Sequence, residues 1–213
     1  MRLLVLYTTS IICGICMMAL EMIGARALFP SFGSSVDTWA AIISVFILSF
    51  SVGYVLGGVV ADRMRSNAAL GWLILGAGIL YCLLPIYSLA FCESLGESVH
   101  QAAWGPLVGA LALFLAPSLL LGGISPVLVK LAFVSADRVG RTTGTLYAVG
   151  SIGNFAGILG ANYVLLRYVP LNDSILGMGV ALCLLGLCHL FLRMEVTAEA
   201  GGGASSAAGG EPA

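Results

Sequence analysis

Residues 21–39, EMIGARALFPSFGSSVDTW, follow an apolar run from Leu3 to Leu20 that contains no charged residue. About 18 residues at ~1.5 Å per residue nearly cross the ~30 Å hydrocarbon core of a bilayer. The quoted stretch places Glu21 and Arg26 at the end of this first helix, before a turn rich in Pro, Gly and Ser. A carboxylate attached to a membrane span is costly, so Glu21 is expected to have a partner, a bound proton or a functional role.

The composition of the whole chain indicates an integral membrane protein. Of 213 residues, 60% are hydrophobic and only 9% are charged, whereas soluble domains carry about 25% charged residues. The net charge of −1 and the lack of basic stripes give no reason to expect nucleic-acid binding. Cys13 and Cys16 form a CxxC without a second pair or a matching His, so we interpret them as small core residues and predict no metal site and no cofactor.

Six apolar segments predict an all-α bundle of six transmembrane helices in one domain, residues 1–193. Each segment reaches the ~20 residues that a spanning helix needs. The expected helices are about 3–28, 38–61, 67–92, 101–132, 142–166 and 174–192. Residues 194–213 are rich in Gly and Ala and are predicted to form a disordered tail.

The distribution of basic residues predicts the orientation in the membrane. Seven Lys and Arg residues fall on the side of the N-terminus and two on the opposite side, and basic residues favour the cytoplasm. The seven are Arg2, Arg63, Arg65, Lys130, Arg138, Arg141 and Arg193, and the two are Arg26 and Arg167. We therefore expect both termini in the cytoplasm, the turn within 21–39 outside, and an uncleaved first span rather than a signal peptide.

The second apolar segment carries a face of small residues and ends on two charges. Small residues recur every four positions at Ser49, Gly53 and Gly57, which lets another helix approach closely. The string Gly58-Val-Val-Ala-Asp62-Arg63 resembles the Gly-x-x-x-Asp-Arg signature of major-facilitator transporters. Asp62 is expected to accept backbone or Arg hydrogen bonds at a helix junction rather than to touch substrate.

Two further segments contain candidate functional features. In the fourth, Pro117, Gly122-Gly123 and Ser125-Pro126 predict interruptions of the helix, which either expose backbone groups for a ligand or form a packing kink. In the fifth, a polar stripe lies on one helix face and either bonds a neighbouring helix or lines a ligand site. The stripe comprises Tyr147, Ser151 and Asn154, with Gly144 one turn earlier.

Three blocks of residues together resemble the membrane domain of the fused major-facilitator/spermidine-synthase family of bacteria. The first contains Met18, Glu21, Arg26, Pro30, Gly33, Ser35 and Trp39. The second contains Gly53, Tyr54, Gly57, Gly58, Ala61, Asp62 and Arg63. The third contains Pro117, Gly122, Ser125, Pro126, Gly140, Arg141, Gly144, Tyr147, Ala148 and Gly153.

The resemblance implies half of a major-facilitator fold in a bacterial cytoplasmic membrane. In that family a soluble aminopropyltransferase-like domain follows the membrane half, and the motifs of that domain are not in this sequence. We therefore expect no enzyme activity from this chain alone. The first hypothesis is a membrane module that acts as scaffold or amine passage with a separate aminopropyltransferase-like partner.

Two alternatives remain open. The chain is a homodimeric transporter of a polyamine or another cation, with Glu21 attracting the amine and Tyr147 and Asn154 supplying hydrogen bonds, or it is a membrane anchor or assembly factor. Glu21 and Arg26 lie about 140° apart around a helix and are poor partners for each other. Residues 21–39 are therefore predicted to join the first two helices at the outer side, with a substrate-facing Glu21 as the alternative.

Overall fold

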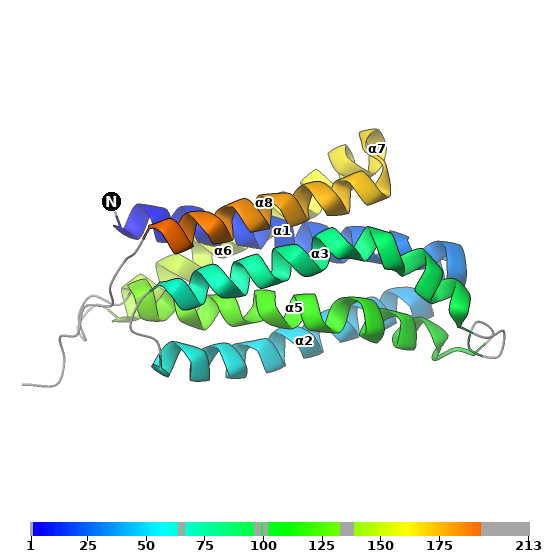
Figure 1. Cartoon of the computed structure of the whole chain (residues 1–213), viewed down its shortest axis with the longest axis horizontal. Helices are drawn as coiled ribbons and strands as arrows, with labels where there is room; N and C mark the ends of the chain where they lie inside the picture. Colours follow the sequence, from blue (N-terminus) through cyan, green and yellow to red (C-terminus); the bar gives the residue numbers. More distant parts are fainter. Residues whose placement is uncertain (1, 64–66, 96–98, 100–101, 133–138, 193–213) are drawn as a thin grey trace, which may run out of the picture.

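The computed structural model describes residues 2–63, 67–95, 99, 102–132 and 139–192 (Figure 1). The helices are α1 (Arg2–Phe32), α2 (Val36–Arg63), α3 (Ala68–Ser94), α5 (Gly105–Ala132), α6 (Val139–Gly160), the π-helical segment η2 (Ala161–Leu165), α7 (Leu166–Tyr168) and α8 (Leu171–Phe191). Each expected segment overlaps one long helical run, with ends that differ by no more than four residues. The predicted tail, 194–213, lies outside the described residues.

Six helical runs of the described residues are long and apolar enough to cross a membrane, counting α6, η2 and α7 as one. They lie side by side along the long axis of the molecule (Figure 1). The start of α1 and the end of α8 lie at the same end, as an even number of spans requires. The prediction of an all-α, six-helix membrane protein is confirmed.

The helices pack as three principal pairs: α1 with α6, α2 with α5, and α3 with α8. If each of the first three spans is exchanged with its counterpart among the last three, α1 exchanges with α5, α2 with α6 and α3 with α8. The pairing is then preserved, because the α1–α6 pair becomes the α5–α2 pair and the α3–α8 pair maps onto itself. Two spans lie between each helix and its counterpart, so the counterparts run in opposite directions. This pairing is the one that a 3+3 inverted repeat, as in each half of major-facilitator transporters, would produce.

Glycines allow the backbones of α2 and α5 to touch. A Cβ added at Gly57 would overlap the backbone of Gly123, and one at Gly53 would overlap the carbonyl oxygen of Leu119. Ser49, one turn before Gly53, is fully buried. The predicted small-residue face of α2 is therefore confirmed, and its partner is α5.

Glycines also allow close backbone contact in the other two helix pairs. Gly153 and Gly157 of α6 lie against the backbone of Ile11 and Ile15 of α1. Between α3 and α8, an added Cβ at Gly78 would lie 2.7 Å from the backbone nitrogen of Cys183. The α3–α8 contact was not predicted, because no motif in the sequence pairs these two segments.

The turn between α1 and α2 is built by residues 29–39. Gly33 ends α1 with a φ of +75°, a conformation that favours glycine, and its N–H donates to the carbonyl oxygen of Phe29 at 2.9 Å. Ser35 accepts a hydrogen bond from the N–H of Thr38 at 3.3 Å, and the rings of Phe29 and Trp39 pack edge to face. The predicted junction of the first two helices is thus made by the second half of the 21–39 stretch.

Two local expectations are wrong. Glu21 does not lie at the end of the first helix, because α1 continues through Pro30 to Phe32. The fourth segment is not interrupted, since α5 remains helical through Pro117 and Pro126 and buries Pro117, Gly122 and Gly123 against its neighbours. A π-helical segment does occur, at the end of α6, where the sequence predicted a regular helix.

The α2–α5 contact predicts a contrast between neighbouring glycines. Gly57→Ala should destabilise the bundle by about 1–3 kcal/mol, because the new methyl group would overlap the backbone of Gly123. Gly58→Ala is the matched control: Gly58 faces open space, so the change should be neutral or slightly stabilising. Thermal unfolding of both variants in detergent measures the difference, and equal stability would contradict the contact.

Candidate functional site

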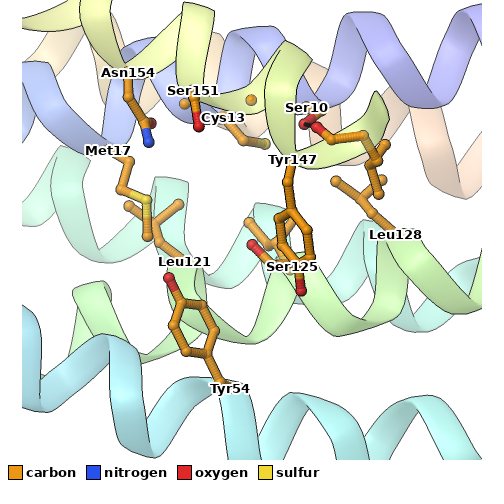
Figure 2. Close-up of a pocket in the computed structure, with 14 residues that line it drawn as sticks. Ser10, Cys13, Met17, Tyr54, Leu121, Ser125, Leu128, Tyr147, Ser151 and Asn154 are labelled. Atoms are coloured by element: carbon orange, nitrogen blue, oxygen red, sulfur yellow. Dashed lines mark hydrogen bonds between the residues drawn. The ribbon is translucent and has the colours of Figure 1, made fainter. Parts of the chain in front are cut away.

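A cavity of about 200 Å³ lies between α1, α2, α5 and α6 (Figure 2). The helices α2 and α6 make no extensive contact with each other, and the cavity occupies the space between them. Residues of α1 and α5 form its remaining walls. Its lining comprises Ser10, Cys13, Gly14, Met17, Tyr54, Leu121, Ile124, Ser125, Leu128, Leu146, Tyr147, Gly150, Ser151 and Asn154. On each helix these residues lie between the middle and the end nearest the N-terminus.

Two tyrosines stand at the open side of the cavity. The ring of Tyr54 rises from α2 and that of Tyr147 descends from α6 into the same space (Figure 2). The two residues are 48% and 55% exposed, so their rings and hydroxyl groups are available to a ligand. Each offers an aromatic face and a hydroxyl that can donate or accept a hydrogen bond.

Asn154 brings an amide to the inner wall of the cavity. Its Oδ1 atom is buried and has no hydrogen-bond partner within the described part of the chain. A Cβ added at Gly14 would lie 2.6 Å from the carbonyl oxygen of Gly150 and 2.9 Å from this oxygen, so Gly14 allows the close approach of α1 and α6 and leaves room for the amide. The nitrogen points toward the cavity (Figure 2), and turning the amide over would exchange its two polar atoms.

Three serines complete the polar lining. Ser10 donates to the carbonyl oxygen of Leu146 at 3.3 Å and so ties α1 to α6. Ser125 of α5 and Ser151 of α6 carry hydroxyl groups at the cavity. The fourteen lining residues include no Asp, Glu, Lys, Arg or His, so the cavity is polar but uncharged.

The structure brings together two of the three predicted substrate residues. Tyr147 and Asn154 line the cavity with Ser151, which places the predicted polar stripe at a cavity rather than only at a helix contact. Glu21 is not part of the lining. It is half-buried one turn beyond Met17 and lies within electrostatic reach of the Tyr81 hydroxyl on α3.

Tyr81 belongs to a separate buried contact. Its hydroxyl forms a 3.2 Å hydrogen bond with Ser118 of α5, and both residues are fully buried. The contribution of Glu21 to substrate binding stays a prediction. Glu21 would have to act from its position one turn beyond Met17, since it does not line the cavity.

Sequence reasoning missed Tyr54 as a candidate ligand residue. It was treated as part of a motif around Gly53 and Gly57, which lie on the buried face of α2. Tyr54 lies about 100° from Gly53 around the helix and therefore faces the cavity beside that packed face. The available signal was a polar aromatic residue within an otherwise apolar span.

The other residues of the three family-like blocks, which we predicted to be structural or gating residues, occupy different surroundings. Asp62 pairs with Lys130 of α5 at 3.8 Å, a partner that the sequence did not predict. With side chains that are 82% and 43% exposed, this ion pair contributes little to stability. Gly58, Gly140 and Gly144 face open space. Exposed positions are also occupied by Arg26, Arg63 and Arg141.

A buried histidine of α8 forms a hydrogen bond with a residue of α1 that does not line the cavity. His189 of α8 shares a 2.7 Å hydrogen bond with the hydroxyl of Thr9, and the Asn67 side chain donates to the carbonyl oxygens of His189 and Leu192. These bonds satisfy carbonyls at the end of α8. The contact is structural and lies away from the cavity.

A second cavity, of about 490 Å³, lies at the other end of the bundle. Three prolines from different helical regions, Pro30, Pro85 and Pro170, contribute to its lining together with Glu93 and Cys92. Burial raises the pKa of the Cys92 thiol, an effect opposed by its hydrogen bond with Ser31. None of the predicted substrate residues lines this cavity.

The fold and the first cavity define a multi-pass membrane protein with an uncharged polar site between its helices. No group of three or more His, Cys, Asp or Glu residues suited to a metal ion occurs among the described residues. Comparisons with protein-family models, with curated proteins and with solved structures give no match to the chain.

Proposed function

We propose that this chain provides a passage for a small amine through the membrane and that the cavity between α1, α2, α5 and α6 is its binding site. The observation that carries this proposal is a polar cavity that is lined by four candidate membrane-spanning helices and open on one side. Polar groups within membrane spans characteristically face protein or a cavity and mark substrate pathways. The inverted-repeat pairing supports it, because transporters of this architecture place substrate sites between their repeats.

The lining suits an amine with an apolar body. The tyrosine faces attract a cation, and the serine hydroxyls and the Asn154 amide accept or donate hydrogen bonds. Leu121, Leu128 and Met17 supply apolar contact. The choice of an amine rests on the resemblance to the fused major-facilitator/spermidine-synthase family.

The charge at the two ends of the bundle supports the proposed orientation. Among the described residues, Arg63, Lys130 and Arg141 are exposed basic residues at the end that contains the N-terminus, and Arg26 and Arg167 are exposed at the opposite end. Basic residues favour the cytoplasm, and seven of the nine in the sequence fall on the side of the N-terminus, so we place both termini there. That the membrane is a bacterial cytoplasmic membrane is what the family resemblance implies. The cavity then lies in the cytoplasmic half.

A separate aminopropyltransferase-like protein is the proposed soluble partner, and it would meet the module at the cytoplasmic end, near the cavity. Support comes from the three sequence blocks that resemble the family. Purification from the native membrane in mild detergent, followed by mass spectrometry, should recover such a subunit with the chain. Recovery of the chain without any synthase-like subunit would contradict this partnership.

A second copy of the chain is also part of the proposal. One copy supplies walls from four helices and leaves the tyrosine side of the cavity open. Two copies that face each other across this side would enclose a central passage, as the two halves of a twelve-helix transporter do.

Uptake of radiolabelled spermidine into proteoliposomes tests the site. Tyr147→Phe removes one hydroxyl from the cavity and should lower initial uptake up to about tenfold, the effect of one lost hydrogen bond. Tyr163→Phe is the matched control, because Tyr163 is exposed on the same helical run but does not line the cavity. Equal uptake by wild type and Tyr147→Phe would contradict the site.

Two further results of this assay have defined meanings. Unchanged uptake by Glu21→Gln would remove Glu21 from the mechanism. Uptake no faster than in protein-free liposomes would contradict the passage and leave an anchor or assembly role.

A further inference from the structure

The open side of the cavity is flanked by α2 and by the helical run of α6, η2 and α7. Both elements bury one face against the bundle and expose the other: α2 buries a single stripe from Thr38 to Ala61, and α6 buries only Leu146, Gly153 and Gly157. The two elements run in opposite directions, so α2 ends where α6 begins (Figure 1). Together they form the surface through which Tyr54 and Tyr147 are exposed.

Charges at the ends of these two elements are complementary. Asp37 and Asp62 lie near the two ends of α2, and Arg141 and Arg167 lie near the two ends of the α6–α7 run. All four are exposed. At 1.5 Å per residue the acidic residues are ~37 Å apart along the axis and the basic residues ~39 Å apart, so the two spacings match.

Side-chain sizes also match when α2 of one copy is placed beside the α6–α7 run of another copy. When Asp62 is set opposite Arg141, Val59 of α2 faces Gly144 of α6 and Val55 faces Ala148. Val55 and Val59 are exposed, and Gly144 faces open space within its own copy. Small residues on the surface of a membrane helix allow close approach of another helix, and the valines would fill the space that they leave.

We propose that a second copy of this chain docks on this surface, with α2 of each copy packed along the α6–α7 run of the other about a twofold axis parallel to the helices. Asp37 then pairs with Arg167 of the partner copy, and Asp62 with Arg141 of the partner copy. Twofold symmetry makes each pair twice. The two cavities face each other across the axis, and each copy closes the open side of the other's site. This inference rests on the proposed function because it names the partner that completes that site.

The outer pair gives the cleaner test, because Lys130 already neighbours Asp62. Donor-labelled and acceptor-labelled copies are reconstituted in liposomes, and Förster transfer reports the dimerisation constant. Asp37→Arg or Arg167→Asp alone should lower this constant about tenfold, which is ~1.4 kcal/mol spread over two symmetric contacts. The double variant, Asp37→Arg with Arg167→Asp, should restore transfer because it re-forms both pairs with reversed polarity.

Asp173→Arg is the matched control, since Asp173 is an exposed aspartate near the same end of the bundle but lies on α8, off the docking surface. It should leave transfer unchanged, and thermal unfolding of each variant confirms that the fold persists. A monomeric wild type, single variants with wild-type transfer, or a double variant that remains impaired would each overturn the proposal.

The uptake assay separates this inference from the proposed function. A dimer that shows charge-swap rescue but does not take up spermidine would retain the docking surface and reject the passage. Spermidine uptake by a protein that stays monomeric would retain the passage and reject the docking surface.

Discussion

The close approach of helix backbones at glycine residues is the constraint on which the rest of this structure depends. In a bilayer, burial of apolar side chains gives no net drive for helices to associate, because lipid tails are equally apolar. Van der Waals packing and interhelical hydrogen bonds supply the association, and the packing includes the backbone contacts of Gly57 with Gly123, Gly153 with Ile11, and Gly78 with Cys183. Exchange of the first three spans with the last three relates the α1–α6 pair to the α2–α5 pair and maps the α3–α8 pair onto itself, and glycine contacts occur in all three pairs.

The cavity follows from that pairing. Because α1 packs on α6 and α2 packs on α5, α2 and α6 are left on either side of a space that neither fills. The glycine face of α6 lies about 100° from Asn154 around the helix, so tight packing on α1 turns the polar stripe toward the cavity. The same residue pattern therefore packs the helix against α1 and turns Tyr147, Ser151 and Asn154 toward the cavity.

The sequence was sufficient to predict the six spans, the small-residue face of α2 and the joint appearance of Tyr147 and Asn154 on one face, because hydropathy and helical periodicity act locally. It was not sufficient to place Glu21, whose surroundings depend on how α3 and α5 pack beside α1. Nor did it predict that α5 stays helical through Pro117 and Pro126, since neighbouring helices determine whether a proline interrupts a membrane helix. Tyr54 was missed because its role appears only once α2 and α6 are placed across the same space.

The proposed amine site lies between α1, α2, α5 and α6 in the cytoplasmic half of the membrane, so a water-soluble reagent should reach it more readily from the cytoplasm than from outside. A cysteine at position 151, introduced by Ser151→Cys into a background without the native cysteines, tests it through its reaction with a membrane-impermeant maleimide. The account predicts rapid labelling in inverted membrane vesicles, slow labelling in right-side-out vesicles, and a decrease in the rapid rate when spermidine is added. Absence of labelling from both sides, or a rate in inverted vesicles that spermidine does not change, would contradict it.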